Sequence, residues 1–214
     1  MRIDFISDIS CPWCALGLAS LEKALAQLGD EISYELYFQP FELNVDMPRE
    51  GKNLVEYLTE KYGMSAEMVA ASHEQLRSRG QAVGFDFGKR EFIWNTFDAH
   101  RLLFWASIAG APKSQLNLKR ALVRAYHTLA LNPSDYQVLI NLVVEVGLDP
   151  AEAKKILESD MYTKDVRRLE LEWHQLGINA VPSMVINRKK LLQGALPVEN
   201  LVNALRQMNA EENN

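Results

Sequence analysis

Two cysteines separated by two residues, Cys11 and Cys14, are the side chains that most directly suggest chemistry. On the first turn of a helix, positions three residues apart share one face, so the two sulfurs can form a disulfide. Pro12 suits the first helical position, where its missing N–H would be unpaired anyway. The free N–H groups of that turn and the helix dipole favour a thiolate at Cys11. The spacing predicts thiol–disulfide exchange, with Cys11 as nucleophile and Cys14 as the more buried resolving thiol.

The cysteine pair has two alternative interpretations, and the sequence supports both less well than it supports redox chemistry. Cysteine is a common core residue, so both could be ordinary buried side chains. Half of a zinc site is the second alternative, but the chain has no third cysteine and a structural zinc ion needs four ligands. We therefore expect no metal, and we expect Trp13 to be a partly exposed aromatic that contacts the substrate. Four histidines show no metal-ligand spacing with the pair: His73, His100, His127 and His174.

The segments around the cysteines predict a strand, a helix and a second strand. Residues 3–6 form a short apolar run that is typical of a buried strand. The helix is expected to run from Pro12 to residue 28 and to end at Gly29. Residues 32–38 alternate in polarity and indicate a strand, which residues 39–41 should end. A right-handed crossover would make the two strands parallel neighbours.

The middle of the chain predicts helices almost throughout. We expect them to begin near Asn53, Ser65, Asn95, Pro112, Ser134, Asp149 and Tyr162. The helix from Asn95 should reach residue 110, and the helix from Pro112 should reach residue 131. Two aromatic residues of a glycine-bracketed loop, Phe85 and Phe87, are expected to pack on the core.

The last forty residues return to a strand pattern. Residues 183–187 and 190–193 predict a hairpin, and a final helix should open at Pro197. Residues 1–44 and 177–214 together suffice for a four-stranded mixed sheet flanked by helices. We therefore predict an α/β protein with a thioredoxin-like core, interrupted at residues 45–176 by a large all-helical insertion domain.

A second part of the site is expected at Val181 and Pro182, just before the hairpin. An X–Pro bond adopts the cis form at a small penalty, although a trans proline at the start of a strand is the commoner arrangement. A cis bond would turn the Val181 backbone toward a substrate peptide, which could add as a strand. Asp8 could cap the turn before the helix or handle the proton of Cys14. Asn95 and His100 are further candidates for a proton relay or for lining the site, although a lone histidine on such a helix is usually structural.

Several segments resemble the DsbA family, and within it the FrnE-like cytosolic branch. The similar segments are residues 7–14, 39–44, 95–101, 125–126 and 177–183. The resemblance runs over nearly the whole chain. It implies a thioredoxin fold with a helical insertion, and a cis Pro182 packed against the cysteines.

Two departures from the family pattern affect the expected chemistry. DsbA proper has a histidine between the proline and the second cysteine, where this chain has Trp13. Without that histidine, Cys11 should be less acidic and the disulfide less oxidising. The related 2-hydroxychromene-2-carboxylate isomerases, which depend on glutathione, carry a serine at the first cysteine position. Cys11 and Cys14 argue against isomerase chemistry without excluding it.

Composition, charge and hydropathy argue against several other classes of protein. The chain has 214 residues, is 48% hydrophobic and carries a formal net charge of −5. Nucleic-acid binding needs clustered Lys and Arg, so nucleic acid is not an expected partner. No run approaches the ~20 apolar residues of a membrane span. The N-terminus enters the first strand without a signal region, which together with the dithiol predicts a cytoplasmic protein.

The sequence thus predicts a cytoplasmic thiol–disulfide oxidoreductase that requires no cofactor and acts on a disulfide or dithiol substrate. Glutathione is compatible with this chemistry as a redox partner, and a homodimer through the helical block is compatible with the composition. The alternatives are a glutathione-dependent isomerase or transferase, and a non-enzymatic holdase whose helices present apolar surface.

Overall fold

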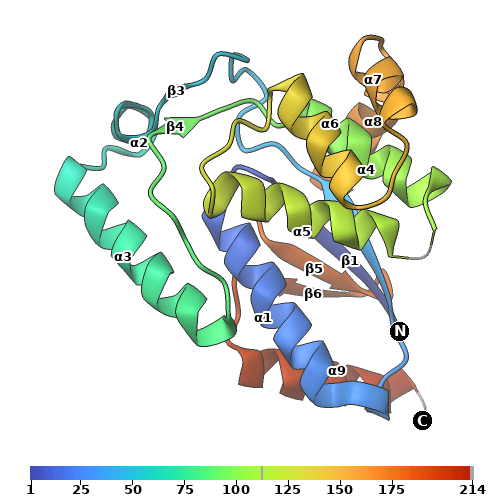
Figure 1. The fold of residues 1–214 in the computed structure, drawn as a ribbon. Coiled ribbons are helices and arrows are strands. Elements are labelled where there is room, and N and C mark those ends of the chain that lie inside the picture. Colours follow the sequence, from blue (N-terminus) through green and yellow to red (C-terminus); the bar gives the residue numbers. More distant parts are fainter. Residues whose placement is uncertain (112, 213–214) are drawn as a thin grey trace.

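A four-stranded mixed sheet lies at the centre of the computed structural model, which describes residues 1–111 and 113–212 (Figure 1). The order is β2-β1-β5-β6, with β1 and β2 parallel and the other neighbours antiparallel. This confirms the predicted fold class. The strands are β1 (Arg2–Ser7), β2 (Glu35–Pro40), β5 (Ser183–Ile186) and β6 (Lys190–Gln193).

Helices surround this sheet, and most of them come from the segment between β2 and β5. Helix α1 (Pro12–Leu28) follows β1 and packs beside the C-terminal helix α9 (Val198–Glu212). A short 3-10 turn, Gly29–Glu31, follows α1. The intervening helices are α2 (Leu54–Tyr62), α3 (Ala66–Val83), α4 (Phe97–Ala109), α5 (Ser114–His127), α6 (Tyr136–Glu145), α7 (Pro150–Leu157) and α8 (Thr163–Gln175).

The inserted segment contains a small sheet as well as helices, so the prediction of an all-helical insertion is wrong in this detail. Strands β3 (Lys52–Asn53) and β4 (Phe92–Ile93) form a two-stranded antiparallel ladder within it. Two residues are too short to show an alternating pattern, and the partners lie about forty residues apart, so the sequence carries no local signal for this pair. The division of the chain at residues 44 and 176 stays a prediction.

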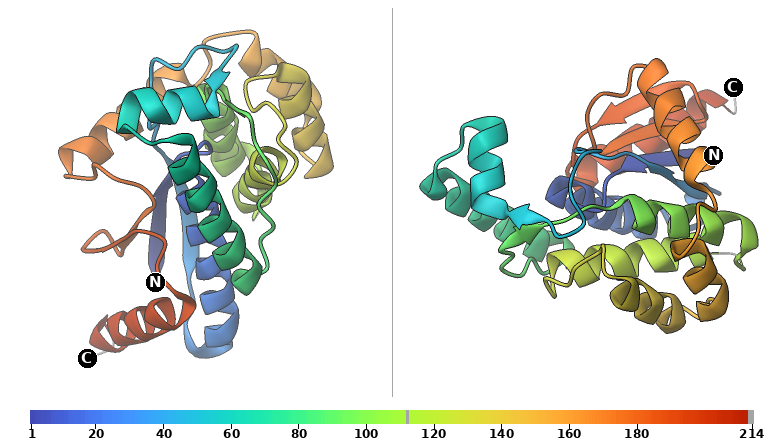
Figure 2. Two further views of the ribbon diagram at one scale, coloured as in Figure 1. Left: turned by 90° about the vertical axis from the view of Figure 1, so that its left-hand side faces the viewer. Right: turned by 90° about the horizontal axis from the view of Figure 1, so that it is seen from above.

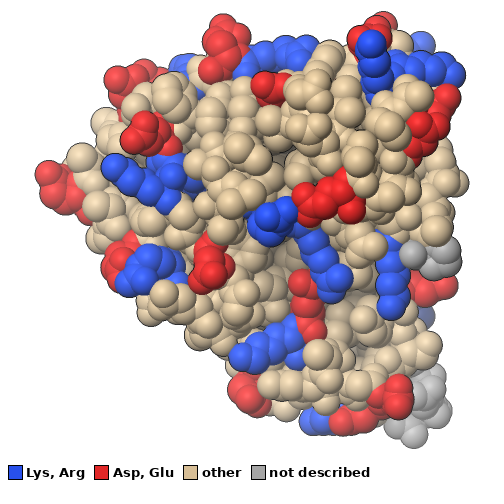
Figure 3. Space-filling view, viewed as in Figure 1, with Lys and Arg blue, Asp and Glu red and all other residues tan. Residues whose placement is uncertain are grey.

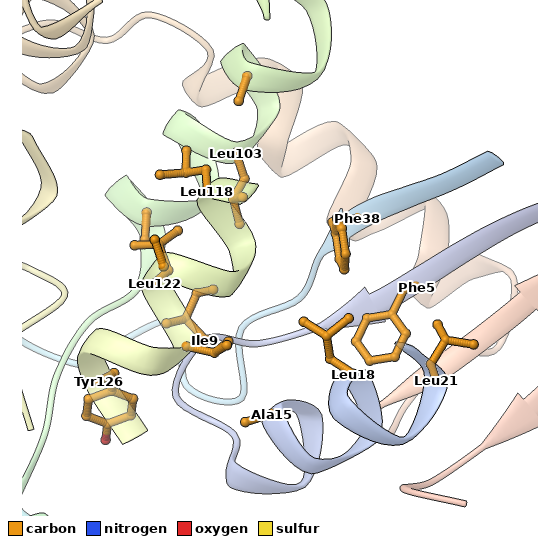
Figure 4. Close-up of a cluster of buried hydrophobic side chains, with 14 of the residues drawn as sticks. Phe5, Ile9, Ala15, Leu18, Leu21, Phe38, Leu103, Leu118, Leu122 and Tyr126 are labelled. Atoms are coloured by element: carbon orange, nitrogen blue, oxygen red, sulfur yellow. The ribbon is translucent and has the colours of Figure 1, made fainter. Parts of the chain in front are cut away.

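One continuous hydrophobic core joins the sheet to the inserted helices. Successive side chains of β1 point to opposite faces, so Phe5 packs toward α1 while Ile6 packs against Trp173 of α8. Figure 4 shows Phe5 and Phe38 directed toward α1, with side chains of α5 completing the same cluster. The inserted helices therefore share their core with the thioredoxin-like part. As predicted, Phe87 is buried and Phe85 packs against the core.

Some element boundaries differ from the prediction. Strand β2 continues through Pro40, which was expected to end it, because an edge strand tolerates a residue that lacks an N–H. Helix α4 is capped at Thr96, and the cap of α6 is Asp135 rather than Ser134. Helix α5 ends at His127, not at residue 131. Pro112 lies outside the described residues.

Helices α2 and α3 project to one side of the molecule, away from α6 and α7 (Figure 2), and α3 packs along α1. On the face shown in Figure 3, basic and acidic side chains are interspersed without a large patch of one sign. Among residues 1–111 and 113–212, no helix is long and apolar enough to cross a bilayer.

Candidate functional site

The two cysteines stand at the start of α1, as the sequence predicts. Cys11 is the N-cap residue, and Pro12 occupies the first turn. The backbone N–H groups of Cys14 and Ala15 donate to the Cys11 carbonyl at 3.1 and 3.3 Å, which closes the first turn. Both cysteines are free thiols, with Cys11 3% exposed and Cys14 fully buried. Little of Cys11 is therefore exposed to solvent.

The peptide bond between Val181 and Pro182 is cis, as the resemblance implied. This segment lies against the start of α1, where the Cys11 Sγ approaches the Val181 carbonyl oxygen at 3.9 Å. The ring of Pro182 packs on Gly17, where an added Cβ would lie 3.0 Å from the proline Cγ. A glycine at this position lets the loop approach the helix closely. Two segments separated by about 170 residues thus meet at one sulfur.

The two thiols have opposite acid–base character. The hydrogen bond from the Cys14 side chain lowers the pKa of Cys11, against burial, which raises it. Burial raises the pKa of Cys14 well above its usual range, and the neighbouring Cys11 raises it further. Because the thiolate is the attacking form, this polarity agrees with Cys11 as nucleophile and Cys14 as resolving thiol.

Removing the hydrogen bond from residue 14 is expected to make Cys11 less acidic. In Cys14→Ala the midpoint of Cys11 alkylation by iodoacetamide should move to higher pH, because the donor that stabilises the thiolate is gone. Cys14→Ser is the matched control, since its hydroxyl remains a donor. The pH dependence of alkylation, followed by mass spectrometry, measures the shift. Identical midpoints in the two variants would mean that the Cys14 hydrogen bond does not stabilise the thiolate.

Asp8 organises the loop between β1 and α1. One carboxylate oxygen accepts hydrogen bonds from the Ser10 backbone N–H at 2.9 Å and from the Thr96 hydroxyl at 2.7 Å. The other accepts from the Ser10 hydroxyl at 2.7 Å and from the Leu43 backbone N–H at 2.8 Å. This is the turn-capping role predicted for Asp8. It also ties two distant segments, at Leu43 and Thr96, to the residues just before Cys11.

The electrostatics of Asp8 do not favour the alternative role as a base for Cys14. Burial raises its pKa, but His100 and the backbone N–H groups of Leu43 and Ser10 outweigh burial and hold the pKa below its usual value. A carboxylate with four donors and such a low proton affinity is a poor proton acceptor. Asp8 therefore acts as a fixed anion that shapes the loop.

The two other relay candidates have different surroundings. His100 is buried, and its Nε2 lies 3.7 Å from Asp8 Oδ1, so the two side chains face each other in the interior. Asn95 accepts from the Phe97 N–H at 2.8 Å and donates to the Met47 carbonyl at 2.9 Å. Its contacts fix the start of α4 and do not bring it to the cysteines.

A cavity of about 230 Å³ adjoins Cys11. Trp13, which is half-buried, forms part of its wall, and the guanidinium of Arg79 lies 5.3 Å from the Trp13 ring centroid. Most of the lining is apolar, and half of the lining residues come from α2 and α3; the polar groups are Arg90, His73 and two serines, Ser10 and Ser72. The apolar wall includes Leu54, Tyr57, Met64 and Leu76.

Sequence reasoning assigned no individual role to several residues that the structure shows to be buried or hydrogen-bonded near the site, although two of them lie in the segments 39–44 and 95–101 that resemble the DsbA family. They include Thr96, Leu43 and the buried Lys119 of α5. His127, which the sequence brought forward only as a possible metal ligand, places its Nε2 2.8 Å from the Ile9 carbonyl and anchors the loop to α5. The partners lie tens of residues apart, so no spacing pattern could have revealed these contacts.

Comparison with known proteins agrees with this geometry. A solved probable DsbA oxidoreductase from Streptomyces coelicolor is 34% identical, with a TM-score of 0.90 over 99% of this chain and 91% of that chain. Two other structures show the same fold and cover 99% of this chain and 98% of theirs. A 2-hydroxychromene-2-carboxylate isomerase is 15% identical (TM-score 0.75), and the cytosolic disulfide reductase DsbM from Pseudomonas aeruginosa, solved with GSH, is 14% identical (TM-score 0.65). The family description "DSBA-like thioredoxin domain" matches residues 2–206. The chain therefore belongs to the DsbA-like thioredoxin family.

Proposed function

We propose that this protein is a thiol–disulfide oxidoreductase that uses the Cys11-Pro12-Trp13-Cys14 dithiol. The observation that carries the proposal is the meeting of Cys11, at the start of α1, with the cis Val181-Pro182 segment. A Cys11 thiolate attacks one sulfur of a substrate disulfide and releases the other as a thiolate. Cys14 then attacks the Cys11 sulfur, which frees the second substrate thiol and leaves Cys11 and Cys14 as a disulfide. The substrate is reduced by two electrons, and the enzyme dithiol is oxidised by two.

The surroundings of the dithiol suit these steps. The lowered pKa of Cys11 supplies the nucleophile, and the raised pKa of Cys14 keeps the second thiol protonated until the mixed disulfide forms. Val181 and Pro182 are proposed to dock the substrate, with an extended peptide adding beside the Val181 backbone. Pro12 and Trp13 border the cavity beside Cys11 and would contact the part of the substrate next to its disulfide.

Replacing Cys11 by serine should abolish disulfide exchange. A serine hydroxyl does not ionise near neutral pH, so the attacking group is lost. The measurement is the rate of thiol release from glutathione disulfide or an aromatic disulfide mixed with the reduced protein. Cys14→Ser is the control, since it should still release the first thiol at the wild-type rate. Full activity of Cys11→Ser would overturn the proposal.

The direction of the chemistry follows from the reduction potential of the pair. With Trp13 in place of the histidine of DsbA proper, we expect a value nearer thioredoxin, about −270 mV, than DsbA, about −120 mV. Equilibration with reduced and oxidised glutathione, followed by counting free thiols, gives the value. A potential close to that of DsbA would mean that the protein is an oxidant in spite of Trp13.

A glutathione-dependent isomerase or transferase is the second candidate. It is favoured by the apolar cavity beside Cys11 and by the shared fold with a 2-hydroxychromene-2-carboxylate isomerase. Turnover of an aromatic substrate with glutathione that survives Cys14→Ala would support it. A holdase, by contrast, would suppress aggregation of unfolded clients with both cysteines replaced.

Several properties of the protein follow from this proposal. We propose a cytoplasmic location, as in the FrnE-like branch, supported by the shared fold with the cytosolic reductase DsbM. Glutathione is the proposed redox partner, because that reductase was solved with it. No resident cofactor is required by the exchange steps. A homodimer through the inserted helices is a further hypothesis, which the sedimentation behaviour of the protein would test.

A further inference from the structure

Arg90 is a charged residue of the cavity beside Cys11 that the proposed mechanism leaves unused. It lines this cavity of about 230 Å³ together with Cys11, and it is the one permanently charged side chain among the described residues that do so. Its Nε is buried without a hydrogen-bond partner, and no carboxylate of the described residues forms an ion pair with it. Its guanidinium carbon lies 4.7 Å from the centroid of the Tyr126 ring. A guanidinium without a counter-ion therefore borders the space next to the proposed nucleophile.

The backbone around Arg90 is held on both sides. The Gly88 N–H donates to the His127 carbonyl at 2.9 Å, at the end of α5. The Leu54 N–H, at the start of α2, donates to the Glu91 carbonyl at 2.9 Å, and β4 then pairs with β3. A side chain on an anchored backbone loses less conformational freedom when it binds a ligand. The fold therefore presents Arg90 to the cavity in advance.

The rest of the cavity wall suits an apolar ligand. Trp13, Tyr57 and Leu76 are among its apolar and aromatic residues, and none of the described lining residues is acidic. At the roughly 30 Å³ that a water molecule occupies in the liquid, the cavity corresponds to about eight waters, which is room for one substituted aromatic ring. A charge that stays unpaired against such a wall is costly, and an opposite charge is attracted more strongly there than in water. The cavity thus combines an apolar surface with one site for an anion.

We propose that the substrate is a small disulfide whose aromatic half carries a carboxylate, and that Arg90 binds this carboxylate. The inference rests on the proposed thiol–disulfide exchange and names the substrate class of that site. The planar guanidinium matches a carboxylate with two parallel N–H···O bonds. The apolar wall holds the ring, and the Cys11 thiolate attacks the sulfur attached to it. A bond forms between Cys11 and that sulfur, the disulfide bond of the substrate breaks, and its electron pair leaves with the other half as a thiolate.

Two aromatic disulfides test the role of Arg90 in the reduced protein. Dithiobis(nitrobenzoate) carries a carboxylate on each ring, whereas dithiodipyridine is neutral, and each releases a coloured product when Cys11 attacks. In Arg90→Met the second-order rate constant with dithiobis(nitrobenzoate) should fall about 10-fold, because a charge-assisted pair is lost. The loss should lie in the concentration at half-saturation and not in the limiting rate. The rate with dithiodipyridine should equal that of the wild type, since this disulfide has no carboxylate.

Three controls separate carboxylate binding from a general effect of charge or folding. Arg90→Lys keeps the positive charge and should restore part of the preference for dithiobis(nitrobenzoate). Arg77→Met removes an exposed arginine of α3 that pairs with Glu74 outside the cavity, and it should leave both rates unchanged. Benzoate, an aromatic carboxylate without sulfur, should compete with dithiobis(nitrobenzoate) in the wild type but not in Arg90→Met. Phosphate at the same concentration should not compete.

The outcomes distinguish failure of this inference from failure of the proposed function. An equal loss with the two disulfides in Arg90→Met, or no loss with dithiobis(nitrobenzoate), would overturn the role of Arg90. Competition by phosphate as strong as that by benzoate would overturn the aromatic class of the ligand. Absence of any reaction between the wild-type protein and either disulfide would instead overturn the proposed thiol–disulfide exchange.

Discussion

Replacement of Cys14 by serine is expected to turn the protein into a trap for its substrates. Cys11 keeps its position at the start of α1 and can still attack a disulfide, but no second thiol remains to release the mixed disulfide. An intramolecular thiol has a far higher effective concentration than millimolar glutathione in solution. Turnover should therefore fall at least about 100-fold, and a covalent adduct should accumulate.

Intact-protein mass spectrometry after mixing with glutathione disulfide measures the adduct. One glutathionyl group per Cys14→Ser chain is expected, and a reductant should remove it. Cys11→Ser is the control and should stay unmodified, because Cys14 is fully buried and its pKa is raised. An adduct on Cys11→Ser would reverse the assigned roles of the two cysteines. The absence of an adduct on Cys14→Ser would refute them.

The second large effect is expected at Asp8. Asp8→Asn replaces an oxygen that accepts hydrogen bonds with an amide nitrogen that faces donors such as Ser10, Thr96 or Leu43. Because hydrogen bonds to a buried charged group contribute about 1.5–3 kcal/mol each, the unfolding free energy should fall by about 3 kcal/mol. For a chain of this length that corresponds to a loss of about 10 °C in Tm. Denaturant and thermal unfolding measure both quantities.

The Asp8 carboxylate also makes the free energy of unfolding depend on pH, and the lowered pKa fixes the sign of that dependence. The folded-state pKa of Asp8 is lowered, so its contribution to stability is fully present above the unfolded pKa of about 3.9 and is lost as the pH falls below it. Asp8→Asn should lack this acid-sensitive contribution. Thr96→Val, which removes one of the four donors, should cost less than Asp8→Asn and keep the acid dependence. Equal stability of wild type and Asp8→Asn at neutral pH would contradict the role of the carboxylate.

Local patterns in the sequence determined the part of this protein that depends on short-range geometry. The two-residue spacing of Cys11 and Cys14, with Pro12 between them, predicted a helix start that could hold two thiols, and that is where they lie. The apolar run at residues 3–6 and the alternation at residues 32–38 predicted the strands around the helix, because strand periodicity follows directly from side-chain direction. The resemblance of residues 177–183 to the DsbA family predicted the cis Pro182.

Only the tertiary structure decided which distant residues surround the sulfurs. Asp8 meets Thr96 and Leu43, and Lys119 is buried in the core, although each comes from a different segment. A buried lysine in the sequence looks like any exposed helical lysine, since its burial depends on what packs over it. No local sequence pattern predicts the β3–β4 ladder either. Neighbouring residues determine local conformation, whereas burial, proton affinity and cavity shape depend on contacts between segments far apart in the chain.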